Sequence, residues 1–502
     1  MGAPPNTAAG ERGPAEVCFV STVALLLFTG IAAFRGGSPN EVLLPLAASF
    51  IPYAGLFRYP LAVSHSRLFW LVAGGIVIAS VPMVASPPVF SDDLYRYLWD
   101  GEIVRQGINP YRYAPDDPAL AEFRDPLWRK INNSDIPTIY PPVAQLVFAV
   151  AGVFGKSAAV LKAICVAAHI ATTWLVGRLT WRREAVAVYG LNPLVVSEVA
   201  LGGHVDIIAG LFLVGALATM ARALPTAVLL GVLSVGTKLV GLALVPFLAR
   251  ARRARLFIVL GVALVLLPML LAGGAGAGSG ASQFARRWSG NESAFAMVEI
   301  NAGTMLRLIG WWTGSPKGEL RVPGARPLLV RIADTPFDPW AANAVEKKPI
   351  ADRAKFDIDH LSGLLARVVV ASAWLLLATF MFSSRFPPLI GLRWLLLAAL
   401  LLSPQVHVWY LLWLLPLEAA TGRRAVFFWS IGILLAYLPV SGWIAERVWD
   451  EPAFVRPVQY GLLALGLGLD AVGDREESYT QGSVGLPGPV MGPGGRSRSA
   501  GA

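Results

Sequence analysis

Long apolar segments recur along nearly the whole chain and are separated by short polar or basic loops. Many of them approach the length of about 20 residues that an α-helix needs to cross a bilayer. The pattern therefore predicts an all-α polytopic membrane protein, a bundle of about 12–14 transmembrane helices. We expect membrane crossings at residues 17–35, 41–57, 68–86, 158–177, 184–200, 204–222, 255–272, 362–384, 388–403, 408–420, 425–443 and 454–472.

Two further apolar segments are ambiguous, and nearby arginines decide how we interpret them. A single crossing at 224–249 would place the arginine cluster at 250–255 outside, so we expect a hairpin of two short helices that turns near residues 236–238. A crossing at 141–155 would likewise export the arginines that follow residue 177, so we expect a helix at the membrane surface there. Both choices rest on the tendency of basic residues in short loops to stay cytoplasmic.

The short loops then divide into two groups that differ in charge. Those on the arginine-rich side, where we expect both chain ends, carry the 250–255 cluster and most of the other loop arginines. Those on the opposite side carry only Arg35, Lys238 and Arg447. This asymmetry predicts that the arginine-rich side is cytoplasmic.

The same pattern divides the chain into a membrane domain and two tails. We expect a cytoplasmic tail at 1–16, the membrane domain at 17–472, and a disordered Gly/Pro/Ser-rich cytoplasmic tail at 473–502. Two long segments, 87–140 and 273–361, lie outside the membrane in this arrangement. The second opens with a Gly/Ala/Ser-rich stretch, which is typical of a flexible connection.

Composition agrees with a membrane protein and excludes several other classes. Of the 502 residues 55% are apolar and 15% are charged, whereas about a quarter of a soluble domain is charged. The net charge of +10 is spread over many loops, which favours a role in topology over binding to nucleic acid. Cys18 and Cys165 lie in apolar segments and offer neither a disulfide framework nor a metal cluster. Residues 17–34 lack a basic start and a small-residue cleavage site, so we expect a retained crossing.

The unusual polar residues gather on the outer side of this arrangement. Ionisable groups at membrane depth are costly and usually face a cavity or a partner. Several of them arriving from separate helices predict a site. They are Asp92, Asp93, His204, Asp206, Lys238 and His407.

The acidic segment that begins at Ser91 permits two interpretations. Asp93, Tyr97 and Asp100 have the spacing of one helix face. In one interpretation Ser91 caps this helix and the aspartates favour its N-terminal dipole. In the other, a carboxylate at the water–lipid boundary acts as a general base, and Arg96 tunes its pKa.

The basic and histidine side chains also leave alternatives open. Lys238 needs an anion, which is either a lipid phosphate or a structural carboxylate. His204 could bind a sugar, a phosphate or a metal, or could simply be hydrogen-bonded, and both kinds of role are open for His407. The aromatic residues at 409–413 are most simply an interfacial belt.

Three stretches of the first outer segment resemble the outer-loop signature of bacterial GT-C glycosyltransferases. They are residues 92–101 (DDLYRYLWDG), 107–115 (GINPYRYAP) and 139–145 (IYPPVAQ). The resemblance is closest to the polyprenyl-phosphate-mannose-dependent mannosyltransferases. It continues through residues 191–193, Glu198, 203–206, Thr237, Lys238, 403–404 and 407–410, and so covers about residues 65–445.

The resemblance implies a polytopic GT-C bundle with extracytoplasmic loop helices, a lipid-phosphate sugar donor and inversion at the anomeric carbon. Asp93 or Asp92 becomes the base, and Lys238 and Arg96 become cations that stabilise the departing phosphate. The pocket would be lined by Asp100, Tyr140, His204, Asp206 and His407. The chain departs from the family in having Val408 where proline is common, and adjacent aspartates in place of Asp-x-Asp.

Together these features predict a glycosyltransferase in a bacterial plasma membrane, with its active site on the extracytoplasmic face. It would move a hexose from a polyprenyl phosphate to a lipid-linked or envelope glycan, and mannose is the hexose that we expect first. No nucleotide motif is found, and the donor chemistry requires no cofactor, although Asp92 and Asp93 could hold Mg²⁺ or Mn²⁺ weakly. The alternatives are a transporter or lipid-linked-sugar flippase, an enzyme that glycosylates protein side chains, and a non-catalytic sensor of the lipid.

Overall fold

The computed structural model describes residues 13–180, 182–273, 280, 291, 294–312, 319–320, 356–446 and 450–483. Its regular structure is helical, apart from two antiparallel two-residue strands, β1 (Glu319–Leu320) and β2 (Phe356–Asp357). The expected all-α class is therefore confirmed. The predictions for the connection after residue 273, for most of 273–361 and for most of both tails lie outside the described residues.

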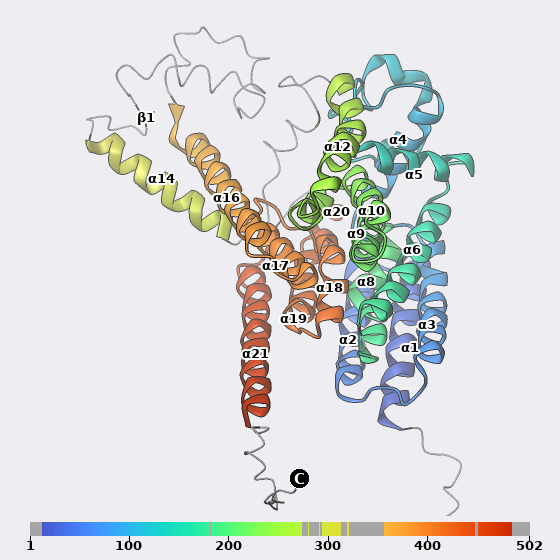
Figure 1. Ribbon diagram of the computed structural model, residues 1–502. Helices are drawn as coiled ribbons and strands as arrows, with labels where there is room; N and C mark the ends of the chain where they lie inside the picture. The colour runs from blue at the N-terminus through green and yellow to red at the C-terminus, as the bar shows by residue number, and fades with distance from the viewer. Residues whose placement is uncertain are drawn as a thin grey trace, which may run out of the picture.

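Four long helices form one side of the bundle (Figure 1). They are α1 (Pro14–Phe34), α2 (Pro39–Arg58), α3 (His65–Ala85) and α6 (Ala158–Leu179). Each buries one apolar face and exposes another: Leu46 is buried in α2, whereas Leu44 and Ile51 are exposed there. Large exposed apolar side chains along a whole helix face suit contact with lipid rather than water.

The middle of the chain consists of shorter helices that are buried against these. In chain order they are α7 (Glu184–Gly190), α8 (Pro193–Ser197), a π-helical turn η3 (Glu198–Gly202), α9 (Asp206–Thr219), α10 (Leu224–Thr237), η4 (Leu239–Leu244) and α11 (Val245–Leu248). The 22-residue helix α12 (Arg252–Gly273) follows them and has many exposed apolar side chains. Asn192-Pro193 breaks the first expected crossing of this group, and the two pieces are bent by 45°. The side chain of Asn192 accepts a hydrogen bond from the Val195 N–H and caps the second piece.

The expected hairpin at 224–249 is present. Helix α10 ends at Thr237, and Lys238 has an extended backbone conformation before η4 begins. The chain then returns along α10, where the backbone of Gly241 packs against Ser234 and Val235. Lys238 therefore stands at the turn, as the distribution of arginines predicted.

The C-terminal half contains α14 (Ala294–Trp312), α16 (Ile358–Ser383), α17 (Pro388–Leu401), η7 (Val408–Trp413), α18 (Leu415–Thr421), α19 (Ala425–Gly432), η8 (Ile433–Tyr437), α20 (Val440–Glu446) and α21 (Val455–Ser483). Within the described ranges, six helices are long and apolar enough to cross a membrane, or seven if the bent α7–α8 pair forms one crossing. Not all of the 12–14 expected crossings are therefore single long helices. Several expected crossings are short pieces: α9 and α17 have 14 residues each, and residues 408–420 form η7 followed by α18.

The first outer segment folds as a small unit on one end of the bundle. It contains α4 (Asp93–Arg105), η1 (Pro118–Phe123) and η2 (Trp128–Lys130), and it packs with α5 (Pro142–Val153), which follows it. Helices α4 and α5 cross at close range because Gly101 has no side chain to overlap the Phe148 carbonyl. Figure 1 shows α5 crosswise to the long helices, and its 12 residues are too few to cross a bilayer. It is therefore the short helix that we expected at the membrane surface.

A buried ion network joins the C-terminal helices. The Arg393 guanidinium of α17 donates to both carboxylate oxygens of Glu418 in α18, at 2.5 and 3.2 Å, and to Asp470 of α21 at 3.4 Å. Glu418 also accepts a hydrogen bond from the Val426 N–H at 2.8 Å. Sequence analysis did not single out this network, because its three charges lie far apart along the chain.

We predict that Glu418→Gln lowers the stability of the protein by about 3–5 kcal/mol, because it leaves a buried arginine without its main partner. The measurement is the thermal unfolding midpoint in detergent. Glu184→Gln is the matched control, since it breaks the more exposed pair with Arg182 and should cost about 1 kcal/mol or less. Equal midpoints for the two variants would show that the buried network does not stabilise the bundle.

Candidate active site

The end of the bundle that carries α4 contains a cavity of about 600 Å³. Its walls come from the N-terminal end of α4, from residues 132–140, from the turn at Lys238, from residues 405–410, and from η8 and α20. These segments are distant in the sequence. The structure therefore brings several of the expected polar residues to one place.

The paired carboxylates lie on the wall of this cavity, and a single side-chain amide holds both. The Asn132 Nδ2 donates to Asp92 Oδ1 at 2.6 Å and to Asp93 Oδ1 at 2.8 Å. Asp92 is the N-cap residue of α4, yet its side chain makes no capping bond, and Ser91 Oγ accepts from the Asp93 N–H at 3.3 Å. Asp92 therefore does not cap the helix, and both aspartates line the cavity.

Sequence analysis did not identify Asn132. It lies in the run Asn132-Asn133-Ser134-Asp135, where nothing in the pattern distinguishes one polar residue from its neighbours. The available signal was its position between the second and third stretches of the family resemblance.

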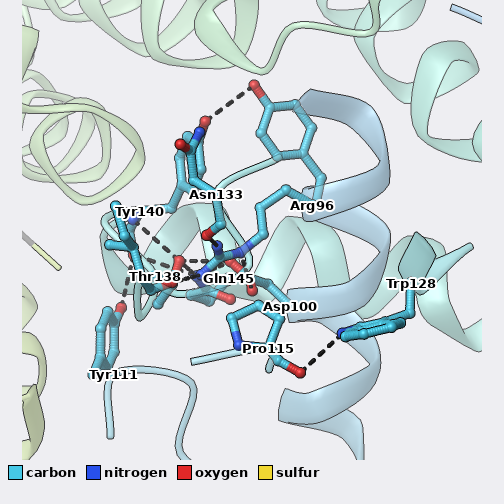
Figure 2. Close-up of polar contacts among 11 residues, drawn as sticks. Arg96, Asp100, Tyr111, Pro115, Trp128, Asn133, Thr138, Tyr140 and Gln145 are labelled. Atoms are coloured by element: carbon cyan, nitrogen blue, oxygen red, sulfur yellow. Dashed lines mark hydrogen bonds and ion pairs between the residues drawn. The ribbon is translucent and has the colours of Figure 1, made fainter. Parts of the chain in front are cut away.

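Arg96 and Asp100 form a buried network behind the carboxylates (Figure 2). Arg96 Nε donates to Asp100 Oδ1 at 2.8 Å, and its other two nitrogens donate to the carbonyls of Asn133 and Ile136. Asp100 also accepts from Thr138 Oγ1 at 2.5 Å. Arg96 reaches the cavity wall, but Asp100 does not. The network fixes residues 133–138 against α4, and with them the adjacent Asn132.

Two tyrosines complete the support of Asp93. The Tyr97 hydroxyl lies 3.5 Å from Asp93 Oδ2, and the Tyr140 hydroxyl lies 3.5 Å from that of Tyr97. Tyr97 also stacks on Phe148, with ring centroids 4.7 Å apart. Burial raises the pKa of both Tyr97 and Tyr140 well above the ordinary tyrosine value. Both hydroxyls therefore stay protonated, and they can donate hydrogen bonds but cannot act as bases.

Lys238 reaches the cavity from the turn between α10 and η4, and its charge is balanced by Asp206. Its Nζ lies 3.1 Å from Asp206 Oδ1, and the Asp206 side chain is fully buried. The ammonium also lies near the rings of Tyr140, Tyr410 and Trp413, at 5.6, 5.3 and 5.9 Å from their centroids. The structural carboxylate considered for Lys238 is therefore real, and the ammonium still reaches the cavity.

His204 and His407 enclose Trp409 in a stack of three rings. Their centroids lie 4.0 and 4.3 Å from that of Trp409, with nearly parallel planes. His407 lies on the cavity wall, whereas His204 lies behind it with its Nε2 3.5 Å from Glu198 Oε2. Tyr437 closes this group, because its hydroxyl donates to Glu198 Oε1 at 2.8 Å.

Of the nine expected site residues, the structure thus places six on the cavity wall and three behind it. Those on the wall are Asp92, Asp93, Arg96, Tyr140, Lys238 and His407. Those behind it are Asp100, His204 and Asp206, each of which contacts a residue of the wall. Within the described part of the chain, no three His, Cys, Asp or Glu side chains gather as a metal site would require.

The structure describes two positions of the second outer segment between residues 273 and 294, and both lie at or beside the same cavity. Gly280 packs against the carbonyls of Pro137 and Thr138, where a side chain would overlap them. Asn291 lies on the cavity wall and donates to the Val406 carbonyl at 3.1 Å. At Gly280 the second outer segment therefore contacts the first.

Comparisons with known proteins point in one direction. Residues 55–254 match the family described as "Alpha-(1->6)-mannopyranosyltransferase, N-terminal domain". Alpha-(1->6)-mannopyranosyltransferase A of Mycobacterium tuberculosis is 25% identical over 467 residues, which are 84% of this chain and 83% of that protein. A probable alpha-(1->6)-mannopyranosyltransferase of Mycolicibacterium smegmatis is 26% identical over 412 residues, 74% of this chain and 67% of that one.

A shorter match adds a third genus. Alpha-(1->6)-mannopyranosyltransferase B of Corynebacterium glutamicum is 32% identical over 151 residues, which are 27% of this chain and 24% of that protein. No solved structure gives a significant match. The matched family region contains the acidic segment, the Arg96 network, Asp206 and Lys238. Over residues 55–254 the chain matches the alpha-(1->6)-mannopyranosyltransferase family, and it is a multi-pass membrane enzyme similar to these mannosyltransferases.

Proposed function

We propose that this mannosyltransferase takes mannose from a polyprenyl-phosphate donor and transfers it to a lipid-linked or envelope glycan. The observation that carries the proposal is the arrangement of one cavity: two carboxylates held by Asn132 on one wall, and the Lys238 ammonium on another. The first serves as a base and the second as a counter-ion for phosphate. The transporter and flippase alternatives are set aside, because the family consists of enzymes.

The chemistry is a single displacement at the anomeric carbon. An acceptor hydroxyl forms the new C–O bond and passes its proton to the carboxylate of Asp93, or of Asp92. The bond from the anomeric carbon to the phosphate oxygen breaks, and its electron pair leaves on the polyprenyl phosphate. A single displacement inverts the configuration, so an α-linked product requires a β-linked donor.

Asp93 is our first candidate for the base. Its carboxylate is half-buried and is held from two sides, by Asn132 and by Tyr97. Asp92 also accepts from the Asn132 amide, but its side chain is more exposed to solvent than that of Asp93. A base held in a fixed orientation keeps its lone pair aimed at the acceptor hydroxyl, which favours proton transfer.

Lys238 is proposed to stabilise the leaving phosphate. A cation fixed where negative charge develops lowers the barrier, and its effect is larger in a cavity that excludes water. Asp206 holds the ammonium in place, and three aromatic rings surround it. The guanidinium of Arg96 is already bonded to Asp100 and to two carbonyls, so we now propose that it positions the loop rather than the phosphate.

The arrangement of the helices supports an extracytoplasmic active site. Figure 1 shows the start of α1 and the end of α21 at one end of the molecule, with α4 and α5 at the other. Because α3 leads into α4, Arg58 at the end of α2 lies at the end away from the cavity. Basic residues at that end favour the cytoplasmic side, which leaves the cavity outside the bacterial plasma membrane.

We predict that Asp93→Asn lowers transfer of mannose by about 10²–10⁴-fold, because an amide cannot accept the acceptor's proton. The measurement uses membranes that contain the variant at wild-type levels, and follows label from radiolabelled polyprenyl-phosphate mannose into extractable glycolipid. Asp92→Asn is tested beside it, and Asp116→Asn, an exposed position of the same outer segment, is the matched control. Unchanged transfer by both Asp92 and Asp93 variants would contradict the assignment of the base.

A second prediction separates the catalytic role of Lys238 from its structural one. Lys238→Met alone leaves the buried Asp206 carboxylate without its partner and should destabilise the protein. The double variant K238M/D206N removes both charges and should recover much of the wild-type unfolding midpoint. We expect it to remain at least about tenfold slower in transfer, because the cation for the leaving phosphate is missing. Full activity in a well-folded double variant would exclude this role for Lys238.

A further inference from the structure

A second cavity, of about 550 Å³, lies beside the first and shares part of its wall. The shared residues are Asp92, Asn132, Asn133 and Trp443. The smaller cavity therefore ends at the Asn132 amide and the Asp92 carboxylate, whereas Lys238 faces only the larger cavity. Asp92 and the Asn132 amide thus stand at the boundary between the two spaces, and Asp93 lies beside them on the wall of the larger cavity.

The remaining wall of the smaller cavity is basic. It is formed by Arg129, Lys130 and Ile131, and both basic side chains belong to exposed residues. Within the described part of the chain neither of them forms an ion pair. The Lys130 ammonium lies 5.1 Å from the ring centroid of Tyr95 in α4, which keeps it near the cavity without neutralising its charge.

These cations are held on a fixed base. Arg129 and Lys130 belong to the short helix η2, which begins at Trp128. The Trp128 indole N–H donates to the Pro115 carbonyl at 2.9 Å, as Figure 2 shows. The backbone N–H of Trp128 donates to Asp125 Oδ1 at 3.0 Å. Asp125 in turn pairs with Lys156, which immediately precedes the α6 cap. The basic wall is therefore anchored to the bundle and does not hang from a loose loop.

A single displacement needs its two substrates on opposite sides of the reacting carbon. If the phosphate of the donor lies near Lys238 in the larger cavity, the acceptor hydroxyl must approach from the other side of the carboxylates. The smaller cavity is the space that adjoins that side. It offers a carboxylate end for a hydroxyl and a cationic end for an anion.

We propose that the smaller cavity binds the acceptor, and that Arg129 and Lys130 recognise an anionic group, a phosphate or carboxylate, carried by that acceptor. The proposal rests on the proposed function, because it assigns the second substrate of the same reaction. The proposal goes beyond that function because it names the cavity that binds the acceptor, the two residues that recognise it and the charge that it carries.

The test is a direct binding measurement that needs no donor. The probe is an octyl oligomannoside that bears one phosphate, and the same oligomannoside without phosphate is the neutral reference. Wild-type protein in neutral detergent should bind the phosphorylated probe more tightly than the reference. The double variant R129Q/K130Q should lose roughly three- to tenfold in affinity for the phosphorylated probe only, as expected for exposed charge pairs. This difference should shrink in 0.5 M salt, because exposed charges are screened.

Arg112→Gln is a matched control, because Arg112 is an exposed arginine of the same segment that lies on neither cavity wall. It should bind both probes as the wild type does. Equal affinities of wild type and double variant for the phosphorylated probe would overturn the proposal. So would an equal loss for both probes, which would show that the pair only supports the fold, or a loss seen only in bilayers of anionic lipid, which would show contact with lipid headgroups.

A parallel transfer assay keeps the two proposals separate. Wild-type transfer from polyprenyl-phosphate mannose to the neutral oligomannoside tests the proposed function by itself. If that transfer is absent while the binding difference is found, the donor assignment fails and the anion site stands. If transfer occurs and the binding difference is absent, the anion site fails and the proposed function stands.

Discussion

The two hydrogen bonds from the Asn132 amide to Asp92 and Asp93 are the contact on which the rest of the site depends. Adjacent carboxylates repel each other, and such a pair is tolerated where donors are shared between them. One amide group supplies both donors and so fixes the distance and direction of the two charges. Charge-assisted bonds of this kind are among the stronger hydrogen bonds in proteins.

The surrounding elements of the fold hold the Asn132 amide in place. Asn132 belongs to a loop without regular structure, and such a loop holds a side chain only if it is itself held. The Arg96–Asp100–Thr138 network ties the loop to α4. Gly101 allows α5 to press α4 from behind, and Gly280 from the second outer segment covers the loop. Lys238 stands on a separate hairpin, so the distance between base and cation depends on how these elements pack.

Much of this arrangement could be predicted from the sequence, because membrane helices leave strong signals. The helix that begins at Asp93, the turn at Lys238 and the shared side of the polar residues followed from hydropathy and from the placement of arginines. The breaks inside apolar segments could not be predicted in this way. Polar groups at such breaks find their partners only when the helices pack, as Lys238 does with Asp206. Nor could the pattern separate Asn132 from Asn133, or show that Arg96 bonds to Asp100 rather than to a ligand.

The central claim is that Asn132 orients the catalytic carboxylates, and its most direct test compares two variants of equal charge. Asn132→Asp replaces the bridging amide with a third carboxylate, whereas Asn133→Asp adds the same charge one residue away. We expect the first to lower transfer at least about 10²-fold, since misplaced catalytic groups cost that much, and the second to change it by only a few-fold. Similar rates for both variants, at equal unfolding midpoints, would contradict this account of the site.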